Sequence, residues 1–411
     1  MTTNNHLNNF IKLDSKILEE HLKTVEELLE VKNLDLDNTK YLADILFCLE
    51  RYDESIEQLK KILSLKSDDS EIITNIGINY FKNKDYETSI KYFTRSLEKN
   101  PGNETALSYK MLSHEFLKDY RSAVECCDEI LKNNSRNTSV INRLIDYHYE
   151  LKNYDDCLDY INQIKYEDKY KKALVLYKLK RYEECIKTTG EIRTAKSYHL
   201  AGKSYYKLGN IVKAVKYLNK SYEIDFNIAS LFEIIDIYFE AKEYQKSIIF
   251  LKKVLIDDDL NIKANKKIAF AYLESGNWYE AIEYSEKTLE ISTKLPEVYI
   301  TLAEAQFQLE PDNLEKINQI LDEGIKENPD SAKLWAEKGG YNFIYNPDTF
   351  RQSYEKALSL NPNNITIYKS YIYLLLLDED DESAKKIYNQ MLFYNPLFEE
   401  SFHDFKSSII T

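Results

Sequence analysis

Histidine and cysteine are the residue types best suited to acid–base, nucleophilic or metal chemistry, and in this chain neither type is clustered. The six histidines occur singly, and none belongs to a His-Glu-x-x-His pattern. The five cysteines lack the spacing of metal ligands, and their odd number predicts reduced thiols. A single Gly pair, Gly339-Gly340, does not make a phosphate-binding loop. We therefore expect no catalytic residue, no metal site and no cofactor, and we predict that the chain is not an enzyme.

A band of lysines and tyrosines is the second group of residues that could do chemistry, in this case the binding of a ligand. Between Lys165 and Lys220 there are 15 Lys and Arg against 5 Asp and Glu, whereas the whole chain has a net charge of −14. Ammonium groups form charge-assisted hydrogen bonds with carboxylates and phosphates, and tyrosine rings add contact area. The band therefore predicts a site for an acidic or phosphorylated segment. The alternative is that these lysines face acidic residues of the same chain, such as Asp146, Glu233 and Glu240.

The elements that position these residues are revealed by a short recurring phrase. It consists of an aromatic residue, two mostly polar residues, a small residue and an aliphatic residue, as in Tyr52–Ile56 and Tyr86–Ile90. Successive copies are 34, 34, 34, 28, 29, 33, 34, 36, 33 and 34 residues apart. The copies start at Tyr52, Tyr86, Tyr120, Tyr154, Tyr182, Ile211, Tyr244, Trp278, Leu314, Pro347 and Asp381. Apolar residues between them follow helical spacing, so the period predicts stacked helix pairs.

This pattern resembles the tetratricopeptide repeat (TPR) family, in which each repeat is an antiparallel pair of helices, A and B. The resemblance implies an all-α fold, a right-handed α-α superhelix (solenoid) of about eleven TPR helix pairs with capping helices. The phrase's small residue would lie where helices A and B cross, because helices that pack closely need a small side chain there. Only Ile317 and Phe350 depart from a small residue at this position.

The chain is accordingly divided into four parts. We expect a disordered N-terminus over residues 1–9 and a capping helix or degenerate repeat over 10–37. The array of eleven repeats would span residues 38–396, with short steps near 154–211, and a C-terminal capping helix would span 397–411. The short steps predict that helix B is about one turn shorter in repeats four and five.

In the resembled family, ligands lie in a concave groove lined by the A helices. The matching positions of repeats five and six fall within the basic band, on one stripe of each predicted helix. The resulting candidate ligand-binding residues are Tyr170, Lys171, Tyr177, Lys178, Lys196, His199, Lys203, Tyr206 and Lys207.

The predicted function is a non-catalytic scaffold or adaptor that binds other proteins or peptides. One alternative is an RNA-binding helical-repeat protein, which the net charge of −14 disfavours because nucleic acid is anionic. A second alternative is the regulatory array of an enzyme complex. We expect no membrane segment, since the longest apolar run, Tyr371–Leu377, is short, and we expect a cytoplasmic location.

Overall fold

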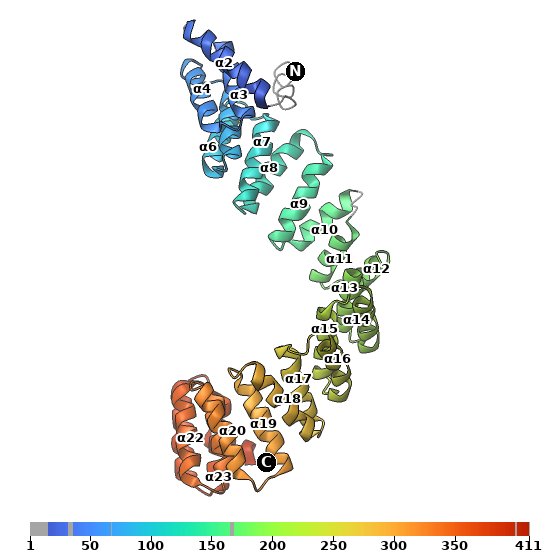
Figure 1. The fold of residues 1–411 in the computed structure, drawn as a ribbon, viewed down its shortest axis with the longest axis vertical. Helices are drawn as coiled ribbons and strands as arrows, with labels where there is room; N and C mark the ends of the chain where they lie inside the picture. Colours follow the sequence, from blue (N-terminus) through green and yellow to red (C-terminus); the bar gives the residue numbers. More distant parts are fainter. Residues whose placement is uncertain (1–14, 32–35, 67, 165–167, 399–400, 411) are drawn as a thin grey trace. The chain divides into compact units, whose positions relative to one another are not determined.

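The computed structural model describes residues 15–31, 36–66, 68–164, 168–398 and 401–410 of the chain. These residues form 24 α-helices and no strand (Figure 1). The all-α helical-repeat fold that the sequence predicts is thereby confirmed. The predicted disorder of residues 1–9 lies outside the described residues.

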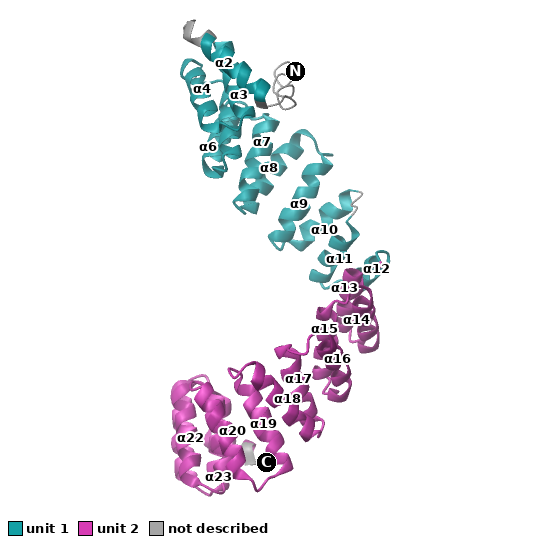
Figure 2. Ribbon diagram, viewed as in Figure 1, with its two compact units in different colours: residues 1–192 teal, residues 193–411 magenta. Residues whose placement is uncertain are grey.

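The helices fall into two compact units, residues 1–192 and residues 193–411 (Figure 2). The boundary lies inside the region that the sequence analysis treats as one array, 38–396. Unit 1 contains α2 (Ser15–Val31), α3 (Leu36–Cys48), α4 (Tyr52–Leu65), α5 (Ser70–Lys82), α6 (Tyr86–Lys99), α7 (Glu104–Phe116), α8 (Tyr120–Asn133), α9 (Thr138–Glu150), α10 (Tyr154–Gln163), α11 (Lys169–Lys178) and α12 (Tyr182–Gly190). Unit 2 contains α13 (Ala195–Lys207), α14 (Ile211–Asp225), α15 (Ile228–Glu240), α16 (Tyr244–Asp257), α17 (Ile262–Glu274), α18 (Trp278–Ile291), α19 (Pro296–Leu309), α20 (Leu314–Glu327), α21 (Ala332–Asn342), α22 (Pro347–Leu360), α23 (Ile365–Leu377), α24 (Asp381–Tyr394) and α25 (Phe402–Ile410).

Helices α3 to α24 form the eleven predicted pairs, in which each odd-numbered helix is helix A and the next is helix B. Every residue that starts a copy of the phrase, from Tyr52 to Asp381, is the first residue of a helix B. Most A helices begin after an Asn or Asp whose side chain accepts a backbone N–H, as Asn103 does from Ala106. Such an N-cap satisfies a donor that the first helical turn leaves unpaired.

The turn between helices A and B is also the same in most repeats. The residue two positions before helix B has a left-handed backbone in nine repeats, with φ between 54° and 75°. Glycine fills this position twice, as Gly209 and Gly276, and elsewhere it is mainly lysine. A left-handed residue after a helix lets the chain reverse within a few residues, so this turn fixes where helix B begins.

The helix A–helix B crossings are built on complementary side-chain sizes. All eleven residues at the predicted small position are buried, including the larger Ile317 and Phe350. In repeat two a Cβ on Gly77 would lie only 2.6 Å from the ring of Phe93, so no larger residue fits there. Repeat three reverses the sizes, with Met111 on helix A and Cys127 on helix B, whose sulfur atoms are 3.3 Å apart. A large residue on one helix thus faces a small one on the other.

The shorter B helices of repeats four and five are present where the sequence predicts them. Helix α10 has 10 residues and α12 has 9, whereas α4, α6 and α8 each have 14. A difference of about four residues corresponds to one helical turn.

Additional helices cover the apolar faces at the outer end of each unit. In unit 1, Leu18 and Leu22 of α2 are buried against the Leu42 side of α3. In unit 2, Phe405 of α25 is fully buried, and its ring centroid lies 5.3 Å from that of Tyr388. End repeats of a helical array need such cover because each repeat buries its apolar face only against a neighbour.

Candidate functional site

The unit 1 part of the basic band lies on α11, and its central lysine already has a counter-ion. Lys171 forms an ion pair with Asp146 of α9, and its Nζ atom lies 5.3 Å from the centroid of the Tyr149 ring. Tyr170 and Tyr177 are half-buried, and the Tyr177 ring meets Tyr182 edge-on at 5.6 Å. The candidates on α11 therefore contact neighbouring helices of the same unit. Lys178, by contrast, is exposed.

The unit 2 part of the band lies on α13 and faces carboxylates of α15. Lys203 Nζ is 2.8 Å from Glu233 Oε1. The Tyr206 hydroxyl donates a hydrogen bond to Glu240, and this bond together with burial raises the pKa of Tyr206 to about 12. Lys207 lies 5.7 Å from the Tyr206 ring centroid, and both Lys196 and Lys207 are exposed.

These contacts favour the alternative reading for Lys171 and Lys203, whose charges are balanced by acidic residues of adjacent repeats. Within the described part of the chain, the candidates without an ion pair are Lys178, Lys196 and Lys207. The number of lysines in the band therefore overstates the positive charge that is available to a ligand.

The pairing follows a rule that joins consecutive A helices. Positions are counted back from the first residue of helix B in each repeat. The A-helix residue eight positions before this point forms an ion pair with the A-helix residue of the next repeat that lies eleven positions before the corresponding point. Three junctions obey it: Asp146–Lys171, Lys203–Glu233 and Asp236–Lys267. Partly exposed ion pairs contribute only about 0–1 kcal/mol each, so they add little to the stability of the helix stack.

His199 has the most enzyme-like surroundings of the candidates. Its Nδ1 atom lies 2.8 Å from the Ser230 hydroxyl, and its Nε2 atom lies 4.0 Å from Glu233. Ser230, however, is completely buried and donates its hydroxyl proton to Ser221 at 3.0 Å. Burial lowers the pKa of His199, although Glu233 partly offsets this effect. Because no substrate can reach Ser230, the group serves helix packing and has no access for nucleophilic catalysis.

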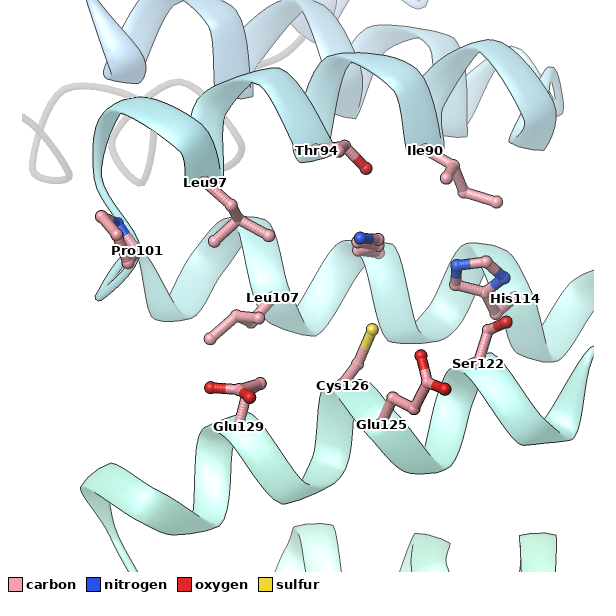
Figure 3. A pocket seen from close by; sticks show the side chains of 11 residues that line it. Ile90, Thr94, Leu97, Pro101, Leu107, His114, Ser122, Glu125, Cys126 and Glu129 are labelled. Carbon is pink, nitrogen blue, oxygen red and sulfur yellow. The ribbon is translucent and has the colours of Figure 1, made fainter.

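A cavity lies in unit 1 between α6, α7 and α8, at a place where the sequence predicted none (Figure 3). Its volume is about 610 Å³. Apolar side chains of α6 line one wall and acidic side chains of α8 line the other. The lining residues are Ile90, Thr94, Leu97, Pro101, Leu107, Lys110, His114, Ser122, Glu125, Cys126 and Glu129.

Repeat three, which lines this cavity, lacks an aromatic stack that five other repeats have. Two rings pack against each other in five repeats: two, four, six, seven and eight. One is an aromatic or histidine ring six positions before the first residue of helix B, and the other is an aromatic ring six positions after that residue. In repeat two, for example, Tyr80 and Tyr92 stack at 5.3 Å. Repeat three instead has His114 and the small Cys126 at these positions. The signal was therefore readable in the sequence, as a cysteine at the position where four of the five stacked repeats have Tyr and the fifth has Phe.

The cavity thiol is expected to be unreactive in the folded chain. Cys126 is 5% exposed, and burial raises the pKa of its thiol to about 11, so little thiolate exists at neutral pH. Of the five cysteines only Cys48 is partly exposed. We expect iodoacetamide at pH 7.5 to modify Cys48 first, and all five thiols once guanidinium unfolds the chain. Mass spectrometry of timed samples measures this, and rapid native labelling of Cys126 would contradict it.

The described residues contain no group of three or more His, Cys, Asp and Glu side chains that could hold a metal ion. None of their helices combines the length and the apolar character needed to cross a lipid bilayer.

Known structures with similar folds are remote from this chain. One is a complex of Naa15/Naa10 bound to HypK-THB, with a TM-score of 0.46, 14% identity, and coverage of 94% of this chain and 68% of that one. Another is the C-terminal part of a TPR repeat-containing protein from Cytophaga hutchinsonii, with a TM-score of 0.47, 17% identity, and coverage of 56% and 98%. The Cut9-Hcn1 hetero-tetramer of the APC/C gives a TM-score of 0.38 at 14% identity, and coverage of 100% and 96%. At these scores none of the likenesses bears on function.

The family model gives a more direct result. No curated protein matches the chain. The model described as tetratricopeptide repeat matches residues 70–103 and residues 195–228, one site in each unit. Each match covers one complete helix pair, α5–α6 and α13–α14, and the same A–B arrangement recurs in the other nine pairs. The chain therefore contains tetratricopeptide repeats, which the family model matches at one site in each unit.

Proposed function

We propose that the protein is a non-catalytic scaffold that binds an acidic or phosphorylated segment of a partner protein on the exposed face of α13. The observation that carries this proposal is the charge of repeat six. Residues 193–220 contain seven Lys and Arg and no Asp or Glu, which is unusual in a chain of net charge −14. A TPR fold by itself supports only the broader role of a protein-interaction scaffold.

The two exposed lysines of α13 are the proposed contacts. Lys196 and Lys207 are eleven residues apart, so they lie on the same side of the helix about three turns from each other. An extended segment spans this distance of roughly 16 Å with about five residues. Lys203 lies between them, but its ammonium group is paired with Glu233, so its charge is largely neutralised. Tyr206, whose hydroxyl is fixed by Glu240, adds an aromatic surface beside Lys207.

The experiment is a quantitative pull-down with the full chain as bait. In the variant Lys196→Glu/Lys207→Glu the Lys203–Glu233 ion pair stays intact, so the helix content should be unchanged. The matched control is Lys385→Glu/Lys386→Glu, which has the same change in charge at two exposed lysines of α24. We expect the first variant to lose acidic or phosphorylated partners by at least about tenfold, and the control to retain them. Equal recovery by both variants would show that α13 is not the site.

The two alternatives each have a separate test. An RNA-binding repeat protein should give a salt-dependent mobility shift with single-stranded RNA, since phosphate contacts release counterions. A regulatory array should co-purify with an enzyme and change its activity. Residues 193–220 are the part of the chain that favours RNA, and the acidic remainder opposes it.

A further inference from the structure

The loop edge of repeats six and seven in unit 2 exposes an unusual number of apolar side chains. At the end of α14, Ile224 is 54% and Phe226 is 71% exposed. At the end of α16 and in the loop that follows, Ile256 is 82% and Leu260 is 60% exposed, and Ile262 at the start of α17 is 38% exposed. We refer to these five residues as the apolar edge. Soluble proteins rarely leave such a group uncovered unless something binds to it.

The two parts of the apolar edge are neighbours in space. The ring of Phe226 meets that of Tyr222 edge-on, with centroids 5.8 Å apart. The Tyr222 hydroxyl in turn donates a hydrogen bond to Asp257 at 3.4 Å, directly after Ile256 in the chain. The loops after α14 and α16 therefore form one surface.

Phe226 adopts a backbone conformation that its side chain disfavours. Its φ and ψ are 45° and 36°, in the left-handed region. All other non-glycine residues with positive φ, apart from Arg193, occupy the recurrent turn between helices A and B. A bulky residue in this region is a rare outlier, whereas Asn tolerates it. The fold thus holds an aromatic ring in solvent at a position where Asn or Gly would be more stable.

The two segments that carry the apolar edge contain negative charge alone. Residues 221–229 and 254–262 contain five carboxylates and no lysine or arginine. The carboxylates belong to Glu223, Asp225, Asp257, Asp258 and Asp259, and all five residues are exposed. Lys263, the nearest lysine in sequence, lies 4.1 Å from the Phe232 ring centroid and is held there.

We propose that the apolar edge docks a basic amphipathic segment of a partner protein. Its apolar side chains would cover Phe226 and Ile256, and its lysines or arginines would meet the surrounding carboxylates. An acidic segment would be repelled, and a purely apolar one would leave the carboxylates without counter-ions. This proposal does not depend on the function proposed above.

The probe is a fluorescently labelled 14-residue peptide of Leu and Lys, with Leu at helical spacing. Its binding to the full chain is measured by fluorescence anisotropy. We expect binding that weakens at least about tenfold in the variant Phe226→Asn/Ile256→Asn, because anchors at the centre of an interface dominate its affinity. Since Asn accepts the left-handed backbone, we expect the single variant Phe226→Asn to have an unchanged or higher Tm. Loss of binding without loss of stability separates docking from a folding role.

Two control variants address position and charge. The variant Ile344→Asn/Tyr345→Asn replaces two side chains of similar exposure, 75% and 62%, in another loop of unit 2, and it should bind normally. Asp225→Asn/Asp259→Asn should weaken binding and reduce its salt dependence. The proposal is overturned if Phe226→Asn/Ile256→Asn binds like the wild type, or if a Leu and Glu peptide binds equally well. It is also overturned if the chain alone self-associates in sedimentation and that variant is monomeric, since the occupant would then be a second copy.

Discussion

Replacing Ala281 by arginine is expected to lower the free energy of unfolding by at least about 1–3 kcal/mol through overpacking alone. Ala281 is completely buried where α18 crosses α17, in a cluster that includes Ile268 and Tyr272. A longer side chain forces the helices apart, and a guanidinium without a partner adds a desolvation cost. Helices α17 and α18 also pack against neighbouring repeats, so the damage should spread beyond repeat eight.

Urea unfolding followed by circular dichroism measures this effect. Glu286→Arg, on the exposed side of the same helix, is the control and should change stability by no more than about 0.5 kcal/mol. An unchanged urea midpoint for Ala281→Arg would mean that Ala281 does not lie at a tight crossing, and the assignment of helix A and helix B contacts would then be wrong.

The second large effect is expected at the crossing of repeat two, where Gly77 faces the fully buried Phe93. Phe93→Cys should cost about 3–5 kcal/mol, as truncation of a buried phenylalanine leaves a cavity. Gly77→Met should also destabilise the chain, because any Cβ meets the ring at 2.6 Å. The double variant reproduces the Met111–Cys127 arrangement of repeat three and should recover much of the combined loss.

A double-mutant cycle in urea measures the recovery. We expect a coupling energy above about 1 kcal/mol, since residues that share a cavity are not additive. The pair Gly339 and Tyr354, with a corresponding approach of 2.6 Å, offers an independent crossing for the same cycle. Strict additivity at both crossings would contradict size complementarity as the rule of packing.

Most of the fold was predictable from the sequence because its determinants are local. An aromatic residue begins helix B in seven of the eleven repeats, and a left-handed turn precedes it by two residues in nine, so the start is marked within a few positions. The shortened α10 and α12 follow from counting residues between such starts. The division of the chain into two units near residue 192 was not predictable, because the recurring phrase continues on both sides of it.

The candidate site was less predictable, because charge along the sequence does not show which side chains meet. Lys203 and Glu233 are 30 residues apart, and only the helix A packing brings their charged atoms to 2.8 Å. The cavity beside Cys126 was missed for a different reason. A cysteine six residues into α8 reads as an ordinary small buried residue until the rings of the other repeats are seen to stack.

The ion pairs between consecutive A helices also make the repeats non-interchangeable. A second copy of repeat seven inserted after the first would set Asp236 opposite a duplicate of Glu233, so two carboxylates would meet where Lys267 now lies. A second copy of repeat six would place Lys203 opposite a duplicate of Leu200. Either duplication would therefore leave an unpaired or like-charged contact at its new junction, at a cost of about 1 kcal/mol or less.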